Sequence, residues 1–91
     1  MKPVSQLVPG AIATLLRAGP LSPAKVAFAW KAAVGPAMAR VTAVKLDGNI
    51  LLVDAATSAW GREVTRASGA IMSRLDGLLG EDVIRRIVVR N

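Results

Sequence analysis

The feature that most constrains the fold is the tripeptide Asp47-Gly48-Asn49, which separates two short runs rich in branched aliphatic residues, 41–46 and 50–55. Aspartate and glycine both accept the positive φ angles of a tight hairpin turn. The pattern therefore predicts an antiparallel pair of strands over these two runs. Alternation along the second strand places Leu51 and Val53 toward a core, with Ala55, and leaves the intervening residues on the reverse face.

Helical periodicity is found on both sides of this hairpin. Apolar residues at near-helical spacing predict a first helix over 4–18. Ser22 followed by Pro23 predicts the start of a second helix, which Gly35-Pro36 kinks before a last turn ending near Arg40. Thr57 or Ser58 offers an N-cap for a long third helix. The apolar stripes expected on the second and third helices comprise Val26, Ala29 or Trp30, Ala33 and Ala37, and then Trp60, Val64, Ala67, Ile71, Leu75 and Leu78 or Leu79.

A third strand is predicted over 83–90, so that the expected order is α-α-β-β-α-β. This order predicts a single α+β domain over residues 1–91, with a three-stranded sheet covered by helices on one face. The reverse face of the sheet stays open in this arrangement.

Composition excludes several classes of function. Only three residues are aromatic and 16 are alanine, so the core must be small and aliphatic. The chain has no cysteine, histidine or tyrosine, and no pair of carboxylates is evidently held across a cleft. We therefore expect no catalytic residue, no metal site, no cofactor and no small-molecule substrate.

The longest uncharged stretch, residues 3–16, is too short to span a bilayer, which takes about 20 residues. We expect a cytoplasmic protein without a membrane partner.

The net charge of +6 points to a polyanionic partner. Arg62 and Arg66 are four residues apart and share one face of the long helix, with Arg74 flanking them. Guanidinium groups spaced in this way can grip successive phosphates. The alternative is an ordinary solvated face with Glu63 nearby.

A second candidate surface lies on the open side of the sheet. Lys45, Arg86 and Arg90 are predicted to border an apolar patch of Ile50, Leu52 and Val88. Basic groups around apolar side chains can hold single-stranded nucleic acid or dock a protein. No aromatic residue is predicted there, which argues against sequence-specific binding. Alternatively, the first helix or a second copy of the chain covers the patch.

Three further motifs have structural interpretations. Trp30 and Trp60 lie on apolar helical stripes, so both are predicted to be buried in the core. The sequence Gly77-Leu78-Leu79-Gly80 matches the G-x-x-G loop of nucleic-acid-binding KH domains, but its middle residues are apolar and carboxylates surround it. We predict that it ends a helix.

Several segments together resemble the DciA family. They are Ala29-Trp30-Lys31-Ala32-Ala33-Val34-Gly35-Pro36, Gly48-Asn49-Ile50-Leu51-Leu52-Val53, Ser58-Ala59-Trp60, the stretch from Leu75 to Gly80, and Ile87-Val88-Val89-Arg90. The resemblance spans about Leu7 to Arg90 in the same order and with similar spacing. It implies a KH-like fold and an adaptor that recruits or helps load the replicative DNA helicase in bacteria and binds DNA.

The leading hypothesis is therefore a non-enzymatic replication adaptor that contacts the replicative DNA helicase and binds single-stranded or double-stranded DNA without reading its sequence. One alternative is an RNA-binding KH-like module. The other is a purely protein-binding domain whose charge only maintains solubility.

Overall fold

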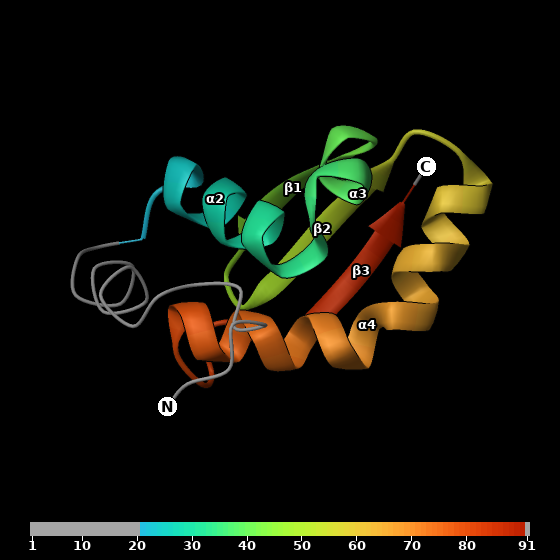
Figure 1. Cartoon of the computed structure of the whole chain (residues 1–91). Coiled ribbons are helices and arrows are strands. Elements are labelled where there is room, and N and C mark those ends of the chain that lie inside the picture. The colour runs from blue at the N-terminus through green and yellow to red at the C-terminus, as the bar shows by residue number, and fades with distance from the viewer. Residues whose placement is uncertain (1–20, 91) are drawn as a thin grey trace, which may run out of the picture.

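The computed structural model describes residues 21–90, which form three helices and one three-stranded sheet (Figure 1). In chain order the elements are α2 (Pro23–Val34), α3 (Pro36–Arg40), β1 (Thr42–Asp47), β2 (Ile50–Ala55), α4 (Ser58–Leu79) and β3 (Arg86–Arg90). The predicted α+β class is confirmed. The helix predicted over residues 4–18 lies outside the described residues.

The start of α2 and the break after it follow the sequence signals. The Oγ of Ser22 accepts a hydrogen bond of 3.2 Å from the backbone N–H of Lys25, and Pro23 occupies the first helical position. Gly35 ends the helix with a φ of 87°, a value that residues with a Cβ atom rarely adopt. Pro36 then opens α3, which confirms the predicted kink.

The hairpin is also confirmed. β1 pairs with β2 in antiparallel orientation, and β2 pairs with β3 in parallel, so β2 is the central strand. The turn itself consists of Gly48 and Asn49, and Gly48 has a φ of 62°. Asp47 does not adopt the positive φ expected for it, because it is the last residue of β1 and pairs with Ile50. β1 starts at Thr42 rather than at Val41, because the N–H of Val41 closes the end of α3 with a hydrogen bond of 3.2 Å to the carbonyl of Met38.

Both ends of α4 carry the caps that the sequence predicts. The Oγ1 of Thr57 accepts a hydrogen bond of 3.1 Å from the N–H of Trp60. At the other end the N–H of Gly80 donates to the carbonyl of Asp76 over 2.9 Å. The interpretation of Gly77 to Gly80 as the end of a helix is confirmed.

The predicted start of the third strand is wrong, because β3 begins at Arg86 and not at Val83. Asp82 has a φ of 69°, a left-handed conformation that turns the chain. Ile84 lies before the strand, but its side chain is 4% exposed and belongs to the core cluster. The N–H of Arg85 donates to the carbonyl of Asn49 over 2.7 Å and guides the chain into β3.

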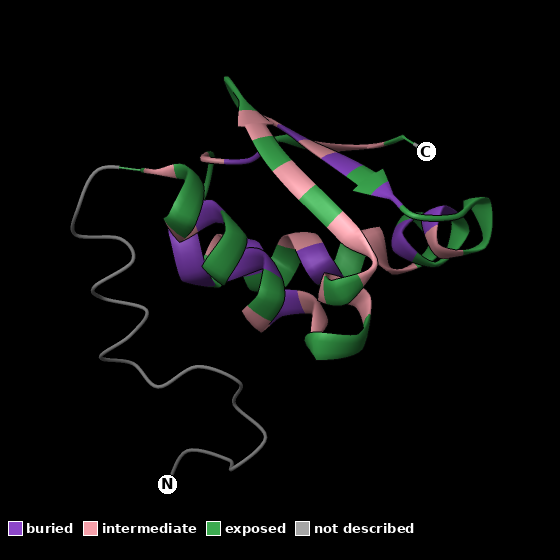
Figure 2. Cartoon of the chain, turned by 90° about the horizontal axis from the view of Figure 1, so that it is seen from above, coloured by how far each residue is buried: buried purple, intermediate pink, exposed green. Residues whose placement is uncertain are grey.

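The core lies between the helices and one face of the sheet. Leu51 and Val53 of β2 are 0% exposed and pack in one cluster with buried residues of α2 and α4. Those helical residues are Val26, Ala29, Trp30 and Ala33 in α2, and Val64, Ile71, Leu75, Leu78 and Leu79 in α4. The predicted inward face of β2 is confirmed, and exposed residues alternate with partly buried ones along β1 (Figure 2).

Three predicted core positions are not fully buried, and one of them is Ala67 of α4, which is partly buried against the core cluster. Ala37 is exposed, because the break at Gly35 interrupts the helical periodicity before α3. Trp60 is only partly buried, since Gly61 is the buried residue of the first turn of α4.

Trp30 is 2% exposed and joins three elements. Its Nε1 donates a hydrogen bond of 2.8 Å to the Oγ1 of Thr42, which in turn donates one of 2.8 Å to the carbonyl of Met38. A buried indole usually requires such a partner for its N–H. The pair of bonds ties α2, α3 and β1 together.

Within residues 21–90, no helix combines the length and the apolar character that crossing a membrane demands.

We predict that the two tryptophans differ in their contribution to stability. Trp30→Ala should lower the free energy of unfolding by about 3 to 5 kcal/mol, because it leaves a cavity and removes the hydrogen bond to the Thr42 hydroxyl. Trp60→Ala should cause a clearly smaller loss, since Trp60 is only partly buried. Urea denaturation monitored by circular dichroism measures both. Equal losses would contradict the assignment of Trp30 as the anchor of this region.

Candidate nucleic-acid interface

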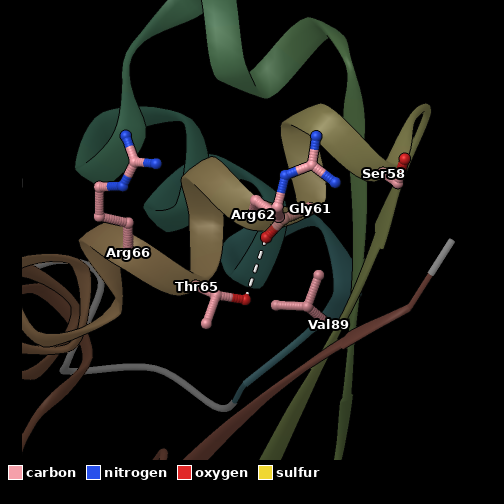
Figure 3. Close-up of a pocket in the computed structure, with 6 residues that line it drawn as sticks. All are labelled: Ser58, Gly61, Arg62, Thr65, Arg66 and Val89. Carbon is pink, nitrogen blue, oxygen red and sulfur yellow. Dashed lines mark hydrogen bonds between the residues drawn. The ribbon is translucent and has the colours of Figure 1, made fainter.

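Arg62 and Arg66 of α4 are exposed and line the same surface depression (Figure 3). We call this depression the α4 hollow; it has a volume of about 430 Å³. Its lining consists of Ser58, Gly61, Arg62, Thr65, Arg66 and Val89. The spacing of the two arginines thus brings their side chains to one site, as the sequence indicated.

The hollow lies where the first turns of α4 pack beside β3. Gly61 is buried, and a Cβ atom built on it would lie 3.4 Å from Cγ1 of Val89 and 3.8 Å from Cβ of Ala55. The Oγ1 of Thr65 donates a hydrogen bond of 3.0 Å to the carbonyl of Gly61. Sequence reasoning did not identify Gly61, Thr65 or Val89 as parts of a site. The glycine in the first turn of a helix was the available signal.

The two arginines of the α4 hollow differ in their partners. Nη1 of Arg66 lies 2.9 Å from Oε1 of Glu63 in an ion pair whose side chains are 74% and 49% exposed. Arg62 makes no ion pair within residues 21–90. No polar or charged residue of the described part is buried, so the basic side chains lie at its surface.

The second predicted group gathers on the other side of the sheet. In the strand register Lys45 lies opposite Leu52, which lies beside Val88, while Ile50 lies beside Arg86. Ile50, Leu52 and Val88 are partly buried although no described helix covers them. We call the three apolar residues and the bordering Lys45, Arg86 and Arg90 the open sheet face.

Arg90 of the open sheet face is held by a carboxylate. Its Nε and Nη2 donate to the two carboxylate oxygens of Asp54 over 3.0 and 3.1 Å, and the register places these residues on adjacent strands. Such two-pronged pairs have well-defined geometry. Lys45 and Arg86 make no ion pair in the described part of the chain.

Arg74, the third arginine predicted on α4, makes an internal contact. Its Nη1 donates a hydrogen bond of 2.9 Å to the carbonyl of Ala33, which belongs to the last turn of α2. Carbonyls at the end of a helix lack partners within the helix, and a cation there is favourable. Arg74 therefore connects the end of α2 to α4, and the lining of the α4 hollow does not include it.

The structure places the predicted surface residues in two separate groups, one at the α4 hollow and one on the open sheet face. β3 separates them, because its side chains alternate between the two sides of the sheet. Val89 faces the α4 hollow, whereas Val88 faces the open sheet face. No cluster of three or more His, Cys, Asp or Glu residues suited to a metal ion occurs within 21–90.

Comparison with known proteins identifies the family. The model of the family described as "Dna[CI] antecedent, DciA" matches residues 3–89. No curated protein and no solved structure matches the chain. The α+β fold is consistent with a KH-like domain. Since the match spans nearly the whole chain, the protein belongs to the DciA family, the non-catalytic proteins that recruit or load the replicative helicase in bacterial DNA replication.

Proposed function

We propose that this helicase recruiter also binds DNA, and that it does so through phosphate contacts without reading the base sequence. The observation that supports this most directly is the α4 hollow, which both Arg62 and Arg66 line, with Arg62 between Arg66 and Ser58 in Figure 3. Guanidinium groups form charge-assisted hydrogen bonds with phosphate oxygens. Bound cations are released from the nucleic acid at the same time, which makes such binding favourable at low salt.

The ion pair between Arg66 and Glu63 does not prevent phosphate binding. Both side chains are about half exposed or more, and exposed pairs contribute only about 0 to 1 kcal/mol. A phosphate group at the α4 hollow can therefore replace the carboxylate of Glu63 as the partner of Arg66. Arg62 needs no such exchange.

Lys45 and Arg86 supply further phosphate contacts in this proposal. They lie on β1 and β3, which are two strand spacings or about 10 Å apart. Arg90 makes two hydrogen bonds to the carboxylate of Asp54, and Arg74 donates to the carbonyl of Ala33, so the proposal does not depend on them. No aromatic side chain lines the α4 hollow. Without a stacking platform, discrimination between bases has little physical basis.

The apolar residues of the open sheet face are proposed as the contact with the helicase. Ile50, Leu52 and Val88 form a row across β2 and β3 on the side that the described helices leave uncovered. Apolar patches framed by charged residues are typical of protein-binding surfaces.

We further propose that residues 1–91 act as one domain. We also propose that this domain works in the cytoplasm, where the bacterial helicase meets DNA.

We predict that the double variant Arg62→Ala, Arg66→Ala binds DNA with a weaker dependence on salt. The slope of log affinity against log salt should fall by about 2 for duplex DNA if both side chains contact phosphate. Fluorescence anisotropy of a labelled oligomer, titrated between about 50 and 200 mM salt, measures this slope. Glu63→Gln is the converse variant and should raise the affinity, because it removes the carboxylate that competes for Arg66.

Two outcomes would count against this assignment. An unchanged slope would remove Arg62 and Arg66 from the interface. A strong preference for RNA over DNA oligomers of equal length would favour the RNA-binding alternative, and absence of any oligonucleotide binding at low salt would favour a purely protein-binding domain.

We predict a different effect at Arg74. Arg74→Leu should lower the free energy of unfolding by about 1 kcal/mol, because the carbonyl of Ala33 loses its charged donor. The salt dependence of DNA binding should stay as in the parent protein. Urea denaturation and the same anisotropy titration test both parts. A slope reduced by about 1 would show that Arg74 does contact phosphate.

We predict that Leu52→Ser abolishes capture of the host's replicative helicase in a pull-down, with or without single-stranded DNA. The matched control is Phe28→Ser, which removes an apolar side chain that is 48% exposed on α2, away from the open sheet face. This control should capture the helicase normally. If the Phe28 variant fails and the Leu52 variant succeeds, the open sheet face is not the contact.

A further inference from the structure

The outer edge of β3 carries backbone groups that no described strand uses. β3 is the last strand of the order β1-β2-β3, and its only partner within residues 21–90 is β2. The outward N–H and C=O groups of an edge strand can pair with a further strand. Extended protein segments use such edges in β-augmentation, in which backbone hydrogen bonds supply the affinity.

Cations flank this edge on both sides of the sheet. On the helical side Arg62 and Arg66 border the α4 hollow beside Val89. On the open side Arg86 extends from the first residue of β3 and makes no ion pair in the described part. The carboxylates nearby are already engaged, Glu63 with Arg66 and Asp54 with Arg90. A strand added at this edge therefore meets positive charge on either face.

A second copy of the same chain is a poor occupant of the edge. β3 reads Arg-Ile-Val-Val-Arg. Antiparallel pairing of two copies centred on Val88 would place Arg86 opposite Arg90 of the other copy, and parallel pairing in register would align identical arginines. Like charges directly opposite each other on adjacent strands are destabilising. The same arrangement favours a strand that carries carboxylates.

We propose that the β3 edge binds an extended acidic segment of a partner protein, which adds to the sheet as a fourth strand. Its backbone pairs with β3. Carboxylates that point to the helical side contact Arg62 and Arg66, and those that point to the open side contact Arg86. This proposal goes beyond DNA binding and does not require it, although both use the same side chains.

The probe is a capped peptide of about six residues with two adjacent glutamates at each end and two valines between them, so that both faces of the added strand carry carboxylates. It is labelled for fluorescence anisotropy and studied with the full chain in the absence of nucleic acid. It should bind at low salt and should slow hydrogen exchange at the backbone amides of β3. Lysine in place of glutamate should abolish binding. A peptide N-methylated at consecutive central residues keeps its charges but cannot form the ladder, and it should bind about tenfold more weakly or worse.

Charge reversal on the protein locates the site. Arg86→Glu, and separately Arg62→Glu with Arg66→Glu, should each weaken peptide binding by about fivefold or more. The matched control is Arg40→Glu, the same charge change on α3, which packs against α2 and β1 at the opposite edge of the sheet. It should change binding by less than about twofold.

Three results would overturn the proposal. The first is equal binding of the N-methylated and parent peptides, which would reduce the interaction to charge alone. The second is an equal effect of the Arg40 and Arg86 variants. The third is unchanged hydrogen exchange in β3 of the parent protein at saturating peptide, a measurement that does not depend on any variant being folded. None of these outcomes affects the salt test of DNA binding, so the two proposals fail separately.

Discussion

The packing of α2 and α4 against a single face of the sheet is the interaction on which the rest of the structure depends. Leu51 and Val53 are fully excluded from solvent only because both helices cover that face. The buried alanines of α2 and Gly61 of α4 have small side chains or none, so the two helices can lie close to the sheet and leave no gap in the core. Both helices cover the same face of the sheet. Among the described residues, nothing covers the opposite face or pairs with the outer edge of β3, so both can contact other molecules.

Features determined by residues close in sequence could be predicted. The Ser22-Pro23 helix start, the hairpin turn with Gly48 and the Thr57 cap each depend on hydrogen bonds or φ preferences within about four residues. Alternation then assigned the two faces of β2, because side chains in a strand must point to opposite sides. The location of Arg62 and Arg66 on the same face of α4 follows from the helical repeat in the same way.

Features that depend on register or on distant segments could not be predicted. Asp54 meets Arg90 only because β2 and β3 pair in parallel in one particular register, and Arg74 reaches Ala33 only because of how α2 and α4 cross. The α4 hollow likewise depends on the proximity of Gly61 in α4 to Val89 in β3. Net charge counts every cation equally. The structure separates Arg74, which donates to a backbone carbonyl, and Arg90, which is held by both carboxylate oxygens of Asp54, from the cations without a partner within residues 21–90 or, like Arg66, with a single contact to one carboxylate oxygen. That distinction narrows the candidate interface to fewer residues than the sequence suggested.

The location of the remaining cations has a consequence for the two proposed interactions. Arg62, Arg66 and Arg86 all lie beside β3, and a guanidinium group engaged by a carboxylate cannot at the same time neutralise a phosphate. An acidic segment bound at the β3 edge would therefore lower the affinity for DNA, and DNA would lower the affinity for the segment by the same factor, because coupling between two binding events is reciprocal. Exposed ion pairs are individually weak, so each contact can be exchanged without unfolding any part of the core.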